Sequence, residues 1–203
     1  MDDHLRVILV GGTSNIGKST VALHLAGRLG WECVSTDKLG RYPGRPWARP
    51  PDAVKPHVVE HYLTHNDEQL VGGQLEHYRN MWPVVEARAR EHAEDPAAAR
   101  LVLEGSGVWP ENVAALRLPN AAAIWLTGSL HLIETRIRRE SRYAEADALG
   151  KRLIDRFIVR SQGYERVMLE ALRRLGLPFV EVTAETSVDL LADQCIERMR
   201  ILV

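Results

Sequence analysis

Short runs of apolar residues alternate along the chain with longer segments whose apolar residues recur at helical spacing. The short runs predict β-strands over Leu5–Gly11, Glu32–Ser35, Arg100–Leu103, Ala121–Leu126 and Phe179–Thr183. The longer segments predict α-helices over Lys18–Leu29, Ala53–Thr64, Asp67–Ala93, Leu130–Glu140, Ala146–Leu175 and Val188–Met199, with a break expected at Pro83. This alternation predicts an α/β fold, a three-layer sandwich in which helices cover both faces of a five-stranded parallel sheet.

The 203 residues are enough for one α/β domain with a proper core, so residues 1–203 are expected to form a single domain. The segment Tyr42–Pro56 holds five of the ten prolines and is therefore predicted to be an exposed loop after the second strand. Loops that leave the carboxyl ends of parallel strands are where ligands bind.

Charge and composition exclude some classes of partner. The 26 Lys and Arg nearly cancel the 27 Asp and Glu, so no overall basic field favours nucleic acid as a partner. Cys33 and Cys195 lack metal-type spacing and are interpreted as reduced thiols. No apolar run approaches the length needed to span a bilayer. We expect a soluble, cytoplasmic protein without a membrane partner, and an oligomer stays open.

The segment Gly12–Ser19 matches the phosphate-loop pattern G-x-x-x-x-G-K-[ST], between a predicted strand and a predicted helix. The two glycines let consecutive N–H groups and the helix N-terminus face one anion. Lys18 is expected to reach the outer phosphates of a nucleotide, and Ser19 to bind the Mg²⁺ ion that bridges them. The predicted nucleotide-binding residues are Gly12, Thr13, Ser14, Asn15, Ile16, Gly17, Lys18, Ser19 and Thr20.

Two acidic residues follow predicted strands and are expected at the same sheet edge. Asp37, after the second strand, is the candidate general base that takes the proton of an acceptor hydroxyl; the alternative is a cap of the following turn. Glu104, after the third strand, stands where a magnesium-organising Asp is usual. Its role stays open between the metal site, an acceptor contact and a structural hydrogen bond.

Arginines of the later helices could clamp transferring phosphate. Arg136, Arg139 and Arg142 have three-residue spacing, which predicts one helical face that stabilises the transferring group and excludes water. A solvated basic face paired with Glu134 and Glu140 is the alternative. Further candidates at four-residue spacing are Arg152, Arg156 and Arg160.

Two other groupings carry less weight. His57, Glu60 and His61 have the spacing of an inverted zinc-peptidase helix, with His65 one turn further, but a polar helix face explains them as well. The proline-rich loop places three arginines around an aromatic ring, either as a pocket for an anionic acceptor or as a loop held by that ring. These residues are Arg41, Arg45, Trp47 and Arg49.

These motifs resemble those of P-loop small-molecule and nucleotide kinases, in order over most of the chain. The segments Gly11–Thr20 and Leu101–Gly105 look most like 2-phosphoglycerate kinases. Asp37 is similar in place to the acceptor-side acid of chloramphenicol phosphotransferase, shikimate kinase and zeta-toxin-like kinases. Arg160 followed by Tyr164 resembles the Arg-x-x-x-Tyr helix after the adenylate kinase lid.

The resemblance implies a P-loop NTPase fold of the nucleoside-kinase type. It also implies an inserted acceptor-binding segment at 38–93, a short lid region within 136–160 and an adenine site near Thr183–Ser187. The acidic pair of nucleoside monophosphate kinase lids is absent from Ala144–Asp147, which makes a nucleotide acceptor less favoured. An Asn-Lys-x-Asp guanine signature and an Asp-Glu pair that closes an apolar strand are also absent.

The sequence therefore predicts a kinase that moves the γ-phosphoryl group of ATP, with Mg²⁺, onto a hydroxyl of a small molecule. The predicted catalytic residues are Lys18, Asp37, Arg136, Arg139, Arg142 and Arg160, and the predicted metal residues are Ser19 and Glu104. A nucleotide or polynucleotide kinase and a slow, nucleotide-binding regulatory ATPase stay open as alternatives.

Overall fold

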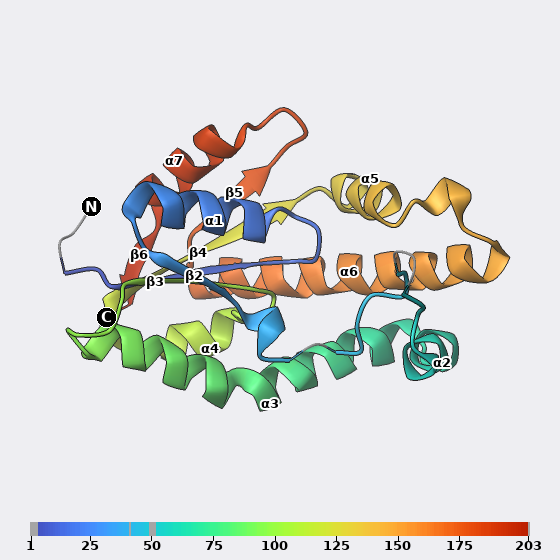
Figure 1. Ribbon diagram of the computed structural model, residues 1–203, viewed down its shortest axis with the longest axis horizontal. Helices are drawn as coiled ribbons and strands as arrows, with labels where there is room; N and C mark the ends of the chain where they lie inside the picture. The colour runs from blue at the N-terminus through green and yellow to red at the C-terminus, as the bar shows by residue number, and fades with distance from the viewer. Residues whose placement is uncertain (1–3, 41, 49–51, 203) are drawn as a thin grey trace.

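The computed structural model describes residues 4–40, 42–48 and 52–202 and confirms the α/β prediction (Figure 1). Five strands form a parallel sheet in the order β2-β3-β1-β4-β5, and a sixth strand pairs with β4 antiparallel to it. The strands are β1 (Val7–Gly12), β2 (Glu32–Ser35), β3 (Leu101–Glu104), β4 (Leu118–Gly128), β5 (Phe179–Val182) and β6 (Arg200–Leu202).

Helices cover both faces of this sheet, with α1 and α7 above it and α3 and α4 below it in Figure 1. The helices are α1 (Lys18–Leu29), α2 (Pro56–Thr64), α3 (Asp67–Glu94), α4 (Pro110–Ala115), α5 (Leu130–Glu140), α6 (Ala148–Leu175) and α7 (Val188–Arg198). Two short 3₁₀ turns are η1 (Thr36–Lys38) and η2 (Tyr143–Glu145). In the described part of the chain, no helix is long and apolar enough to cross a membrane.

The strand residues are buried on both faces because each face has its own apolar cluster. Ile8 and Val10 of β1 point into the cluster that contains α1, α5 and α7, whereas Val7 and Leu9 point into the cluster that contains α3 and α4. This explains why the sequence of β1 is a continuous apolar run rather than an alternating one.

The parallel register brings three strand ends to one edge of the sheet. Val10 of β1 lies opposite Glu104 of β3, and Glu104 lies opposite Ser35 of β2. The phosphate loop leaves β1 at this edge, and η1 leaves β2 there. Residues expected to act together are thus brought together by the topology alone.

The break expected at Pro83 is wrong, because α3 continues through this proline (Figure 1). A helical proline removes one backbone hydrogen bond, and the buried Met81, Val85 and Ala89 stabilise the helix by packing on either side of it. One α-helix and one strand of the described residues were not predicted. The six-residue α4 and the three-residue β6 are too short to show a periodic pattern.

Candidate functional site

The phosphate loop links β1 to α1 in a backbone conformation that requires glycine. Gly12 has φ +142°, and a Cβ atom there would lie 2.6 Å from the carbonyl oxygen of Leu126. Gly17 has φ +110° and precedes α1, where no side chain caps the helix. The first N–H groups of α1 therefore remain available to an anion, as a nucleotide phosphate site needs.

Lys18 is held inside this loop and is only 8% exposed. Its Nζ donates a hydrogen bond of 2.7 Å to the carbonyl oxygen of Thr13. Burial lowers the pKa of Lys18, and the negative charges of Glu104 and Asp37 oppose that shift. A bound phosphate would add further negative charge, so this site favours an anion beside the ammonium group.

Ser19 and Glu104 form the pair expected of a magnesium site. The Ser19 hydroxyl donates a hydrogen bond of 3.0 Å to Glu104 Oε1, and Glu104 is 3% exposed. The described residues contain no group of three His, Cys, Asp or Glu that could hold a metal on its own. Two oxygen donors nevertheless fit Mg²⁺, which keeps several waters and takes its remaining ligands from substrate phosphates.

Asp37 lies in η1 and lines the same cavity as Lys18, Ser19 and Glu104. The cap of η1 is the Ser35 hydroxyl, which accepts a hydrogen bond of 3.3 Å from the Asp37 amide. The capping role considered for the Asp37 side chain is therefore filled by Ser35. The Asp37 carboxylate faces the cavity as an acceptor of protons or hydrogen bonds.

Gly105 and Thr36 hold η1 against the end of β3, a contact that sequence reasoning missed. Gly105 has φ +154°, and a Cβ atom there would lie 1.7 Å from Thr36 Oγ1. Thr36 is completely buried. This close approach fixes η1, which contains Asp37, against the end of the strand that carries Glu104.

The cavity above the loop has a volume of about 250 Å³ and two chemically different ends. One end is lined by the phosphate loop, Glu104 and Asp37. The other is lined by Tyr42, Arg45, Tyr78, Ser106, Phe157 and Arg160. Tyr42, Arg45 and Tyr78 come from the predicted insert of residues 38–93, so the two ends are built by different parts of the chain.

A second cavity, of about 420 Å³, lies on the other side of the phosphate loop. Asn15, Gly17 and Thr20 line both cavities. Thr186, within the segment expected to lie near adenine, and Val182 also line this second cavity. A nucleotide with its phosphates on the loop has room for its base here.

Two of the three arginines expected on one face line this second cavity, and the third does not. Arg136 donates a hydrogen bond of 2.6 Å to the carbonyl oxygen of Ile16, and burial lowers the pKa of Arg136. Arg139 lines the cavity beside it. The helix ends at Glu140, and Arg142 adopts φ +53° with its side chain 70% exposed, 3.8 Å from Glu145. The expectation of one shared face is therefore wrong for Arg142.

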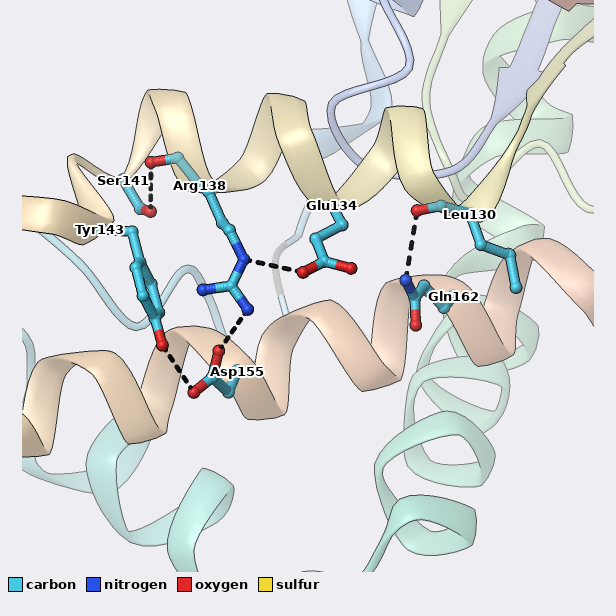
Figure 2. Close-up of polar contacts among 7 residues, drawn as sticks. All are labelled: Leu130, Glu134, Arg138, Ser141, Tyr143, Asp155 and Gln162. Carbon is cyan, nitrogen blue, oxygen red and sulfur yellow. Dashed lines mark hydrogen bonds and ion pairs between the residues drawn. The ribbon is translucent and has the colours of Figure 1, made fainter.

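Helix α5, which carries Arg136 and Arg139, is held on α6 by side-chain contacts, as Figure 2 shows. Arg138 donates to Glu134 at 2.8 Å and to Asp155 of α6 at 3.1 Å. Tyr143 donates to the other Asp155 oxygen at 3.0 Å, and the Arg138 guanidinium lies 3.9 Å from the Tyr143 ring centre. The connection from α5 to α6 is thus fastened by side chains and not only by its short loop.

The earlier arginines of α6 do not point at the phosphate loop. Arg152 is exposed. Arg156 donates to the carbonyl oxygen of His65 and pairs with Asp67, so it joins α6 to the corner between α2 and α3. The expectation that Arg156 points at phosphates is wrong, whereas Arg160, one turn later, lines the first cavity and is 4% exposed.

Glu140 bridges the phosphate loop and the proline-rich loop, a role that sequence reasoning missed. It accepts a hydrogen bond from Asn15 and forms an ion pair with Arg45, and it lines both cavities. The Arg45 guanidinium lies 5.6 Å from the ring centre of Trp47. Arg41 and Arg49, the other arginines considered for an anion pocket, lie outside the described residues.

The histidine grouping on α2 has no metal-site geometry among the residues described. His57 is exposed, whereas the rings of His61 and His65 lie 4.3 Å apart. His61 also contacts Tyr42 edge-on at 5.1 Å. His61 and His65 therefore pack against neighbouring rings of the insert, whereas His57 makes no such contact with the described residues.

No family model and no curated protein matches this sequence. Solved structures match its fold over nearly the whole chain. One is a gluconokinase from Sinorhizobium meliloti 1021, with 16% identity, 94% of this chain and 89% of that chain covered, and a TM-score of 0.52. Another is a shikimate kinase from Bacteroides thetaiotaomicron, with 14% identity, coverage of 94% and 96%, and a TM-score of 0.51. A third is a deoxyadenosine kinase from M. mycoides with bound dATP, with 13% identity, coverage of 95% and 97%, and a TM-score of 0.50.

Proposed function

We propose that this protein is a kinase that transfers the γ-phosphoryl group of ATP, bound with Mg²⁺, to a hydroxyl of a small molecule. One observation carries the proposal. A single cavity joins the phosphate-loop residues Lys18 and Ser19 to a carboxylate, Asp37, and to a lining from a separate insert. Donor phosphates and an acceptor hydroxyl can meet there, and the kinases among the fold's neighbours support this interpretation.

In this proposal the donor occupies the phosphate loop and the second cavity. The loop amides and Lys18 hold the phosphates, while Ser19 and Glu104 hold Mg²⁺, which neutralises phosphate charge when bound. Arg136 and Arg139 stabilise the donor side, and the adenine lies near Thr186. The Glu104–Ser19 hydrogen bond supports the first of the roles left open for Glu104, at the metal site.

Transfer needs one proton to leave the acceptor and one phosphorus–oxygen bond to break. Asp37 accepts the hydroxyl proton as the acceptor oxygen bonds to the γ-phosphorus, and the bond to the β–γ bridging oxygen breaks to release ADP. Lys18 stabilises the negative charge on the leaving phosphates. Segment 38–93 binds the acceptor, and region 136–160 acts as the lid that excludes water.

Two alternatives use the same fold. A nucleotide or polynucleotide kinase is less favoured, because the acidic pair of nucleoside monophosphate kinase lids is absent from Ala144–Asp147 and the 26 Lys and Arg nearly cancel the 27 Asp and Glu. A regulatory ATPase was suggested by the missing magnesium-organising Asp. Glu104 accepts a hydrogen bond from Ser19 and so lies where such an acid is needed, which supports the kinase over that module.

The test is ADP release by the purified protein with Mg²⁺ and ATP, alone and with each member of an acceptor panel. The panel contains phosphoglycerates, sugars, nucleosides, nucleoside monophosphates and hydroxylated antibiotics. A kinase releases little ADP alone and much more with one acceptor class. ATP binding without acceptor-dependent ADP release across this panel would instead support the regulatory module.

A further inference from the structure

Arg160 is a buried cation without a counter-ion among the described residues. It is 4% exposed, and no described carboxylate forms an ion pair with it. One terminal nitrogen donates to the Tyr42 carbonyl oxygen at 3.2 Å, while Nε is buried without a partner. By contrast, Arg156, one turn earlier on α6, and Arg138, on the neighbouring helix α5, each pair with a carboxylate.

The surroundings of Arg160 place it at the insert end of the first cavity. Its guanidinium lies 4.5 Å from the ring centre of Phe157 and 5.4 Å from that of Tyr62. Burial raises the pKa of Tyr62 and of Tyr78, and the positive charge of Arg160 opposes both shifts. Tyr62 and Tyr78 belong to α2 and α3, so Arg160 faces the helices of the insert.

Burying a guanidinium in such surroundings costs free energy unless an anion pairs with it. Removing a charge from water costs several kcal/mol, and two ring faces and one carbonyl oxygen replace only part of its hydration. The other acids that line this cavity are engaged or nearer the phosphate loop. Glu104 accepts a hydrogen bond from Ser19, and Glu140 accepts one from Asn15 and pairs with Arg45. Burial lowers the pKa of Lys18 and the negative charge of Asp37 opposes that shift, so Asp37 lies toward the phosphate loop.

We propose that the acceptor is a compact alcohol that carries a carboxylate or phosphate group, and that Arg160 binds this group while the hydroxyl faces Asp37. This inference rests on the proposed kinase function and names its substrate class. It reassigns Arg160 from the transferring phosphoryl group to the acceptor. The planar guanidinium suits either anion because it can donate two parallel hydrogen bonds.

The test measures binding by calorimetry, with the donor site filled by MgADP so that the phosphate loop cannot hold the probes. Two matched pairs serve as probes, glycerate against its amide and glycerol 3-phosphate against glycerol. We expect one anionic probe to bind at least about tenfold more tightly than its neutral partner. Arg160→Gln should remove that preference and Arg160→Lys should keep part of it. Arg152→Gln, at an exposed position two turns earlier on α6, is the matched control and should leave it unchanged.

Three results would overturn the inference. They are equal binding of neutral and anionic probes, no binding of either anionic probe, and an unchanged preference in Arg160→Gln. If Arg160→Gln instead weakens MgATP binding while anion binding persists, Arg160 serves the donor phosphates. None of these results depends on turnover, so they are distinguishable from a failure of the proposed function, which is an absence of acceptor-dependent ADP release.

Discussion

The donor end and the acceptor end of the first cavity are built in different ways. The donor end is lined mainly by one short stretch of chain within residues 14–20, together with Asp37 and Glu104. In our proposal, backbone N–H groups and Lys18 of this stretch bind the donor. The acceptor end is assembled from the loop after β2, from α3 and from α6, and its lining spans from Tyr42 to Arg160. A donor site of this kind can stay constant while the acceptor site changes, because the two share few residues.

The two ends also differ in what fixes them. Glycine geometry and the hydrogen bond between Lys18 and Thr13 shape the donor loop locally. Hydrogen bonds of Ile16 with Arg136 and of Asn15 with Glu140 also attach the loop to α5. Ring contacts across long stretches of chain hold the acceptor end, as between Tyr42 and His77, stacked at 5.3 Å. We therefore expect substitutions in the insert to leave the donor end largely unchanged. The geometry of the acceptor end should change when its packed rings are substituted.

The largest effect is expected from Lys18→Met, which removes the charge at the donor end. Phosphoryl transfer should fall by about 10³-fold or more, since a buried, preorganised cation is lost. The exposed Lys55 provides the matched control, and Lys55→Met should leave the rate unchanged. Steady-state ADP release measures both. Equal rates for the two variants would show that Lys18 does not contact the donor.

Asp37→Asn separates the two ends, because it removes the proposed base without touching the phosphate loop. The rate of transfer should fall by about 10²-fold, and the dissociation constant of ATP should stay unchanged. Steady-state ADP release measures the rate, and calorimetry with ATP and Mg²⁺ measures the dissociation constant. A loss of ATP binding would place Asp37 on the metal instead of the acceptor.

The pH dependence of stability should have opposite signs for one buried group near each end. Burial lowers the pKa of His61, in the insert, from 6.5 to about 4, with smaller contributions from His65 and Arg160. Between these two pH values, His61 is protonated in the unfolded chain but neutral in the native state. His61 therefore makes the protein less stable as pH falls from 6.5 to 4.

Glu165, which accepts a hydrogen bond of 3.1 Å from the Gly128 amide behind the donor loop, behaves in the opposite way. Burial raises its pKa from 4.5 to about 7, so it makes the protein less stable as pH rises from 4.5 to 7. Each effect amounts to about 3 kcal/mol at most.

Urea unfolding between pH 4.5 and 6.5 measures these two slopes. The quantity to compare is the free energy of unfolding of each variant minus that of the unaltered protein. For His61→Gln this difference should become more negative as pH rises, and for Glu165→Gln it should become more positive, because each variant lacks the pH dependence of the residue removed. Parallel curves for all three proteins would contradict both assignments.

The contact between Gly105 and Thr36, which positions Asp37, should give a smaller change when it is disturbed. Gly105→Ala forces a Cβ atom against Thr36 and a φ of +154° on alanine, so it should cost about 1–3 kcal/mol of stability and slow transfer by moving Asp37. The control is Gly72→Ala, at an exposed helical position with open space around it, which should gain about 0.5–1 kcal/mol. Thermal unfolding compares them, and an unperturbed Gly105→Ala variant would remove Gly105 as a positioning residue.

The same contrast explains how much of the molecule could be predicted from sequence. The fold class and the bounds of β2, α1 and α5 follow from local pattern and are confirmed. The roles given to the phosphate loop, Asp37 and Glu104 stay predictions, although the structure brings these residues together.

The features that were missed depend on distant contacts or short segments. Glu140 reaches Asn15 across 125 residues, and Arg156 pairs with Asp67 across 89 residues. No spacing along the chain reports such pairs. Arg142 was misplaced because the end of α5 at Glu140 decides its direction, and helix ends are the least certain part of a pattern.

The central claim is that one cavity brings ATP and an alcohol together for direct transfer. The most direct measurement follows the γ-phosphorus by phosphorus NMR, with the protein, Mg²⁺, ATP and the alcohol that stimulates ADP release most. Our account predicts that the γ-phosphorus appears in a phosphate monoester of that alcohol, in an amount equal to that of the ADP formed. Accumulation of inorganic phosphate without any phosphate monoester would contradict it.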